Sequence, residues 1–196
     1  MLAKMPSVIR NNQFDARGLA VTPEGLLVPA YVGSELGFNE PGRFYLDNIF
    51  YPELIRRGIL PLCPFKACLE YMDFPRLDEA ESLEERTQIQ EEFNSYIGAV
   101  NYETLMPRSK LMIALLEGHR VDEGLSAEIA YFVKNHGPVV GIRSDFRLCE
   151  NPSAPINLAL RYFLDKGPYN AAFFVGEDSY KKGLEHLEIL AKKIKD

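Results

Sequence analysis

The chain has 196 residues, of which 46% are hydrophobic and 26% charged, a composition typical of globular proteins and not of disordered or fibrous ones. Its 22 Lys and Arg against 28 Asp and Glu give a net charge of -6, which argues against nucleic-acid binding. No stretch approaches the roughly 18 apolar residues of a bilayer span, and the first residues lack the apolar core of a signal peptide. We therefore expect a cytoplasmic protein that binds neither nucleic acid nor membrane.

The beginning of the chain differs from the rest. Residues 1–25 show neither a helical nor a strand period, and we interpret them as an arm on the surface or on a partner. Residues 26–196 fit one domain. Its first strand is predicted over 26–32, an apolar run closed by a glycine, although Pro29 suggests that the strand begins without sheet hydrogen bonds.

The next elements alternate between helix and strand. A mostly helical spacing of apolar residues predicts a helix over 44–57, and a second strand is predicted over 59–65. Residues 66–82 have no clear period and contain a proline, so we expect a loop or lid there. A stripe of apolar residues then predicts an amphipathic helix that runs from 83 to 107.

The second half of the domain continues the alternation. Strands are predicted over 110–116, 138–142 and 171–175, and helices over 124–135, 156–164 and 180–194. This order predicts a doubly wound, mostly parallel five-stranded α/β sheet with helices on both faces. In such sheets ligands bind at the carboxyl ends of the strands, so we expect the site in the loops after strands one, three and four.

Two carboxylates near the third strand are the best candidates for chemistry. Asp122 and Glu128 flank Gly124 at the start of a predicted helix. If Asp122 lies in the loop and Glu128 in the first turns, both point into one crevice. The helix N-terminus would keep one carboxylate ionised as a nucleophile, and a drier environment would keep the other protonated as an acid. The alternative is that both only cap the helix.

Other kinds of site find little support. The histidines are scattered and the cysteines fit no zinc signature, so we expect no metal and three reduced thiols, Cys63, Cys68 and Cys149. Glycine-rich nucleotide-binding motifs are absent, and we expect no organic cofactor. His119 is the one histidine near the carboxylate motif.

The segment IALLEGHRVDEGLSAEIAY, residues 113–131, resembles the hallmark of the nucleoside 2-deoxyribosyltransferase family, a hydrophobic strand followed by Asp-x-Gly-x-x-x-Glu. Four further segments are similar to that family, and together they extend the resemblance over most of residues 30–165: AYVGSELGFNEPGRFY, VNYETLMPRSKLMIALLEG, GPVVGIRSDFR and APINLAL. The resemblance implies a flavodoxin-like (Rossmann-like) fold and transfer of 2-deoxyribose between nucleobases without metal or cofactor.

The resemblance also implies roles for single residues. Glu128 would attack C1′ of a 2′-deoxyribose to give a covalent intermediate, which a second base resolves with retention, and Asp122 would deliver a proton to the departing base. Tyr31 would orient Glu128, Phe38 would pack on base or sugar, and Asn101 would hydrogen-bond to either.

Three more residues belong to segments that the resemblance assigns to substrate binding. Gly33 lies in the first loop, Asp145 in the loop after the fourth strand, and Asn157 in a segment that reaches a neighbouring subunit's site. The resemblance therefore implies a homo-oligomer with shared sites, acting on 2′-deoxynucleosides and free nucleobases.

The sequence departs from the family pattern at Glu35, where most members have proline. A charge there would alter the base preference, discourage a 5′-phosphate or simply face solvent. Two other functions stay open: hydrolysis of 2′-deoxynucleoside 5′-monophosphates at the same glutamyl intermediate, and nucleotide sensing without turnover. Serines 34 and 126 are the feature that would favour a phosphate ligand.

Overall fold

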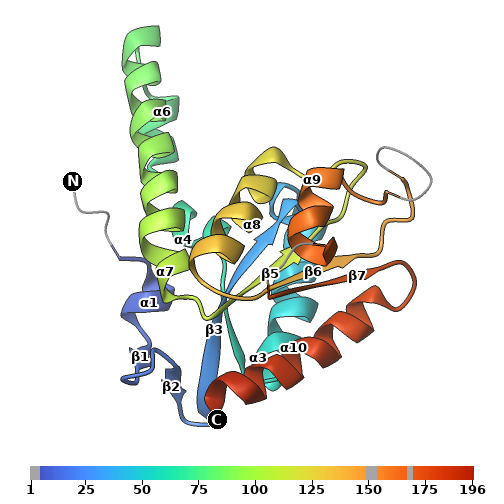
Figure 1. The fold of residues 1–196 in the computed structure, drawn as a ribbon. Coiled ribbons are helices and arrows are strands. Elements are labelled where there is room, and N and C mark those ends of the chain that lie inside the picture. The colour runs from blue at the N-terminus through green and yellow to red at the C-terminus, as the bar shows by residue number, and fades with distance from the viewer. Residues whose placement is uncertain (1–4, 149–153, 167–169) are drawn as a thin grey trace.

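The computed structural model describes residues 5–148, 154–166 and 170–196 (Figure 1). In this part of the chain five parallel strands form the core of the sheet, in the spatial order β4 (Ile59–Leu62), β3 (Gly25–Ser34), β5 (Leu111–Leu115), β6 (Val139–Arg143) and β7 (Ala171–Val175). Numbered along the chain, this order is 2-1-3-4-5, that of flavodoxin-like doubly wound sheets. The expected mostly parallel α/β fold class is confirmed, but the described sheet has seven strands and not five, because two short strands from the N-terminal region extend it.

Helices cover both faces of the sheet, as Figure 1 shows. One face packs against α2 (Glu40–Tyr45), η2 (Leu46–Phe50), α3 (Tyr51–Arg56) and α10 (Ser179–Lys195). The other packs against α6 (Leu83–Gly98), η3 (Ala99–Leu105), α7 (Met106–Arg108), α8 (Glu123–Asn135), α9 (Leu158–Arg161) and η4 (Tyr162–Lys166). Because neighbouring side chains of a strand alternate, Ala30 and Val32 of β3 face the first set and Tyr31 faces the second.

The N-terminal region has more regular structure than its sequence suggests. It forms α1 (Ser7–Arg10), β1 (Gln13–Phe14) and β2 (Ala20–Thr22), and β2 pairs antiparallel with the start of β3. Ser7 also donates two hydrogen bonds to Glu70, its backbone N–H at 2.8 Å. The absence of a period in this stretch was misleading because each element is too short to show one.

Pro29 lies inside β3, where the sequence suggested a lack of sheet hydrogen bonds. Its carbonyl accepts a 2.8 Å bond from Lys110 N–H, and the preceding Val28 donates 2.9 Å to Gly58. Proline has no backbone N–H to donate. This causes no loss at Pro29, because the pairing of β3 with β5 begins only at the next residue, Ala30. The expectation is therefore wrong for the strand as a whole.

The expected loop at 66–82 is mostly helical. It contains the greater part of α4 (Pro64–Leu69) and all of α5 (Phe74–Asp78), and both helices carry a proline in the first turn. A proline is favourable there because the first N–H groups of a helix need no partner within it. The proline indicates a helix start and not a break, which is the physical reason for the error.

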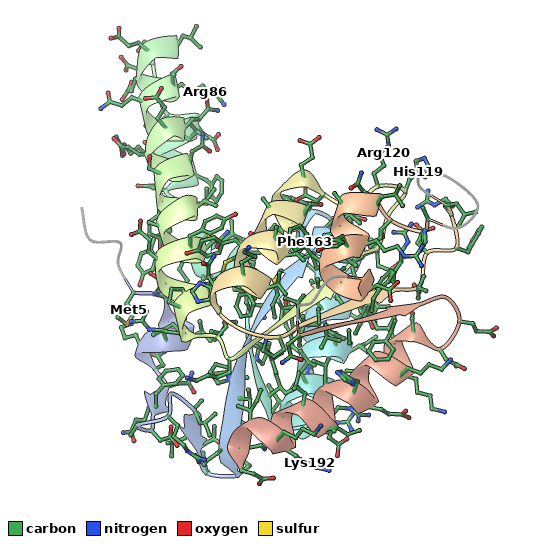
Figure 2. All side chains as sticks on the ribbon, viewed as in Figure 1. Met5, Arg86, His119, Arg120, Phe163 and Lys192 are labelled. Carbon is green, nitrogen blue, oxygen red and sulfur yellow. The ribbon has the colours of Figure 1, made fainter. Side chains whose placement is uncertain are left out.

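The helix α6 extends away from the body of the molecule. Figure 2 shows Arg86 near its far end, clear of the sheet. Phe74 of α5 packs edge to face on Phe93 of α6, with 5.8 Å between the ring centroids.

Across the described residues, no helix combines the length and apolarity that a bilayer crossing requires. Cys149 lies outside these residues.

Candidate active site

The carboxyl end of β3 supplies the first part of the site. Tyr31 and Gly33 point toward α8, and Tyr31 is fully buried. A Cβ at Gly33 would lie 2.4 Å from Leu125 Cδ1 and 3.3 Å from Glu128 Oε2. A side chain at position 33 would therefore have to displace the end of the Leu125 side chain and would crowd Glu128.

The start of α8 holds the two candidate carboxylates in the positions that the spacing predicts. Asp122 is the N-cap, and its Oδ2 accepts a 2.9 Å hydrogen bond from Leu125 N–H. Ser126 Oγ donates to the Asp122 carbonyl at 3.0 Å. Glu128 lies in the second turn, so both carboxylates reach the same crevice.

Glu128 is held by two partners from other elements. Tyr31 Oη donates to Glu128 Oε1 at 2.7 Å, and Asn101 Nδ2 approaches the same oxygen at 3.4 Å. Asn101 is buried in η3, a π-helical stretch inside the long helix, and such stretches often occur at functional sites. Cys68 Sγ, 3.9 Å from Asn101 Oδ1, contacts the carbonyl end of the amide and leaves its nitrogen toward Glu128.

Burial raises the pKa of Glu128 to about 7, the negative charge of Asp122 adds to this, and the bonds from Tyr31 and Asn101 oppose it. Burial also raises the pKa of Tyr31 well above its ordinary value, so its hydroxyl stays a neutral donor. Glu128, which the resemblance makes the nucleophile, is thus a carboxyl whose burial favours the protonated form. The stabilising field of a helix N-terminus fades within the first turn, and Glu128 lies beyond it.

A cavity of about 500 Å³ opens above Glu128. Its walls come from the loop after β3, from α4 and the segment before α5, and from the α6–η3 helix. The apolar part of the lining consists of Phe38, Pro64, Phe65, Cys68, Leu69, Met72, Phe74, Ile97 and Leu125. Phe38 and Phe65 meet edge to face with 4.8 Å between centroids, and Phe38 is 68% exposed. Flat apolar walls over a polar floor suit an aromatic base with a polar sugar.

Most of the predicted site residues meet in this cavity. Gly33, Phe38, Asn101, Asp122 and Glu128 line it, and Tyr31 lies directly behind Glu128. The loops after the first and third parallel strands, β3 and β5, contribute as expected.

Two predicted residues lie elsewhere. Asp145, after β6, is paired with Arg147, whose guanidinium holds the pKa of this carboxyl well below its usual range. Asn157 caps α9, where its Oδ1 accepts from Ala159 N–H at 2.9 Å, and it lines a second cavity of about 510 Å³ together with Arg120. The side chain of His119 is exposed, and Figure 2 shows it beside Arg120.

Several lining residues carried no signal in the sequence. Arg43 of α2 lines the cavity and donates to the Gly37 carbonyl at 3.2 Å. Met72 and Phe74 come from the segment that we expected to be a loop. Glu35, in η1 (Glu35–Phe38), is partly buried against Gly118 and does not line the cavity. Burial and the charge of Asp122 raise its pKa.

Within the described ranges, no three His, Cys, Asp or Glu side chains are grouped to hold a metal ion. The sequence matches no protein-family model. It also matches no curated protein.

Solved structures give a likeness of fold. A conserved protein from Enterococcus faecalis V583 aligns with a TM-score of 0.50 and 18% identity over 82% of this chain and 98% of its own. A 2-desoxiribosyltransferase from Leishmania mexicana aligns with a TM-score of 0.48 and 17% identity over 81% and 98%. A 2-deoxyribosyltransferase from Bacillus psychrosaccharolyticus gives 0.47 and 15% over 80% and 90%. At 18% identity, the likeness to the Enterococcus faecalis protein concerns the fold alone.

Proposed function

We propose that the protein is a cytoplasmic nucleoside 2-deoxyribosyltransferase in which Glu128 is the nucleophile. The observation that carries this proposal is the arrangement at the floor of the cavity. Glu128 Oε1 receives Tyr31 Oη at 2.7 Å and lies beside Asn101, and Asp122 lines the same cavity. A carboxylate fixed by two donors and facing an apolar cavity is suited to attack a sugar carbon.

In the first step, a Glu128 oxygen forms a bond to C1′ while the bond from C1′ to the base nitrogen breaks. The electron pair of that bond leaves with the base, and Asp122 supplies the proton that neutralises it. Positive charge that develops at C1′ is stabilised by the Glu128 carboxylate. Tyr31, a neutral donor, keeps the second Glu128 oxygen directed at the sugar.

In the second step, a nitrogen of the acceptor base attacks C1′ from the face that the first base left, and the Glu128 oxygen departs. The proton of the acceptor returns to Asp122. Two displacements at one carbon restore its configuration, so the product is the same anomer as the substrate. No metal or organic cofactor takes part.

The apolar walls support a base as the group that is exchanged. Phe38, Phe65 and Phe74 line the cavity with aromatic rings, and Met72 adds an adaptable apolar contact. A cavity of about 500 Å³ accommodates a nucleoside.

The test is chromatography of the purified protein with a panel of 2′-deoxynucleosides and their 5′-monophosphates, each with and without a different free base. New deoxynucleosides that form only with an acceptor base are the expected result, and the Glu128→Gln variant should form none. Free base and deoxyribose without exchange would instead establish a hydrolase. Binding without product from any substrate would establish a sensor and overturn the proposal.

We propose further that Asn157 serves the site of a neighbouring copy. It lies outside the cavity of its own chain, on the rim of the second cavity beside Arg120 and Ser126. Mixing inactive Glu128→Gln subunits with weakened Asn157→Ala subunits should restore part of the activity. If mixing restores nothing, each chain has a complete site of its own.

A further inference from the structure

The most unusual side chain outside the cavity is Arg143, at the end of β6. It is fully buried, and no carboxylate is closer than Asp145 Oδ1 at 4.0 Å in the described structure. Its guanidinium donates to the carbonyls of Leu116, Gly118 at 2.9 Å and Arg147 at 3.0 Å. A buried cation is costly, and here backbone carbonyls supply most of its compensation.

Glu117, at the end of β5, makes the reciprocal set of bonds. One carboxylate oxygen accepts from Ser144 N–H at 2.8 Å and from Ser144 Oγ at 3.0 Å, and the other accepts from Asp145 N–H at 3.0 Å. Thus the side chain of Arg143, which ends β6, bonds to the backbone that follows β5. The side chain of Glu117, which follows β5, bonds to the backbone that follows β6. We call this pair the Glu117–Arg143 clamp.

The backbone that the clamp holds requires glycine at position 118. Gly118 has a φ of +90°, which other residues adopt with strain, and the carboxylate of Glu35 fills the space where a side chain at 118 would lie. The chain leaves this fixed point and reaches Asp122 four residues later. The position at which the α8 cap begins therefore depends on the clamp.

We infer that the Glu117–Arg143 clamp is a positioning device for Asp122, the proposed proton donor to the leaving base. The inference rests on the proposed function. Glu128 is fixed separately, by Tyr31 and Asn101 and by the packing of α8 through Leu125 and Ile129. Asp122 is bonded to α8 through Leu125 N–H and follows the clamp along the chain, so loosening the clamp acts on Asp122 before it acts on Glu128.

The two roles can be separated by the choice of leaving group. An ordinary base leaves C1′ with an electron pair and needs a proton to become neutral. In 7-methyl-2′-deoxyguanosine the base already carries a positive charge, so the same bond cleavage releases neutral 7-methylguanine without a proton. Asp122 matters for the first substrate and not for the second.

The experiment measures kcat and KM of wild type and Glu117→Gln with 2′-deoxyguanosine and with its 7-methyl derivative. If the enzyme uses pyrimidines instead, the pair is 2′-deoxyuridine and 5-fluoro-2′-deoxyuridine, whose base is the better leaving group. Glu117→Gln places an amide N–H against a backbone N–H and opens one half of the clamp at a partly exposed residue. Glu123→Gln, also acidic and at the start of α8, is the matched control.

We expect kcat of Glu117→Gln to fall about 100-fold with the ordinary nucleoside and less than about threefold with the activated one, with KM nearly unchanged. Asp122→Asn should show the same selective loss, Arg143→Lys a smaller one, and Glu123→Gln none. Equal losses with both substrates, or no loss, would overturn the inference while the proposed function stands. Wild-type protein that converts neither substrate would overturn both.

Discussion

Different interactions hold the floor and the wall of the cavity in place. The floor is polar, and each of its groups has defined partners: Tyr31 and Asn101 hold Glu128, and Asp122 caps α8. The wall from α4 to α5 is apolar and touches the cavity through side chains such as Met72. Directional bonds fix the floor to within tenths of an ångström, whereas apolar contacts tolerate changes of shape.

Under the proposed function, the reaction takes place at the floor and the wall selects the base. A change in the floor should alter kcat and its pH dependence. A change in the wall should alter the KM of the base and leave the pH dependence unchanged.

The largest effect is expected for Glu128→Gln. Loss of the proposed nucleophile should lower kcat by roughly 10⁴-fold or more, because the bond between the Glu128 oxygen and C1′ can then not form. Initial rates of base exchange give the measurement, with Glu123→Gln on the same helix as the control. Substantial exchange by Glu128→Gln would remove this residue from the reaction.

Gly33→Ala should follow, with kcat reduced about 100-fold. The new methyl group would overlap the end of the Leu125 side chain and crowd the Glu128 carboxylate, which disturbs the position of the proposed nucleophile. Gly98→Ala is the matched control, since nothing lies within 4 Å of its new Cβ, and it should be neutral or stabilising. Equal activity of the two variants would show that close approach of α8 is unnecessary.

The raised pKa of Glu128 also predicts a pH-dependent stability. The folded state binds the proton more tightly than the unfolded state, so this group stabilises the fold below its ordinary pKa and loses that contribution as pH rises to about 7. At pH 8 the free energy of unfolding of Glu128→Gln should therefore exceed that of wild type by up to about 3 kcal/mol. At pH 4 the two values should differ little. Urea titrations at both pH values provide the test; a difference that does not change with pH would contradict it.

Tyr31→Phe should have a smaller effect. The hydroxyl lowers the pKa of Glu128, so its loss moves the rising limb of kcat/KM, expected near pH 7 in wild type, to higher pH. At pH 7 the rate should fall about tenfold and recover partly at pH 8.5. Tyr131→Phe, on α8 and exposed, is the control. An unshifted limb would mean that Tyr31 does not act on Glu128.

The smallest effect is expected from the wall. Met72→Ala removes apolar contact worth about 1 kcal/mol, which should raise the KM of the acceptor base about fivefold with kcat and the pH profile unchanged. Leu83→Ala, at an exposed position on α6, should change neither. A shifted pH profile in Met72→Ala would show that the wall and the floor are not independent.

The sheet was predictable because its strands are apolar runs separated by helical spacings. The placing of Asp122 and Glu128 at one cavity was predictable because they lie close together in one motif. The helices α4 and α5 were not predicted, because Pro64 and Pro75 suggest an interruption of a helix unless they are known to lie in its first turn. The approach of Asn101 to Glu128 depends on the π-helical stretch η3, which has no pattern in the sequence.

The environment of single groups was also beyond the sequence. The raised pKa of Glu128 could not be read from its place in the motif, because burial depends on the packing of α8 against β3 and not on distance from the helix start. The resemblance gives Asp145 a role in substrate binding, and the sequence did not show that its carboxylate is paired with Arg147. The Glu117–Arg143 clamp joins residues 26 positions apart through their backbones, a contact that spacing does not reveal.

The central claim, that Glu128 is the nucleophile, is tested most directly by trapping the intermediate. The protein is incubated with a 2′-deoxynucleoside substrate without acceptor base, quenched in acid, digested with trypsin and analysed by tandem mass spectrometry. The claim predicts a deoxyribosyl adduct on Glu128 within the peptide of residues 121–134, absent after addition of acceptor and absent in Glu128→Gln. Turnover without any adduct, or an adduct on another residue, would contradict it.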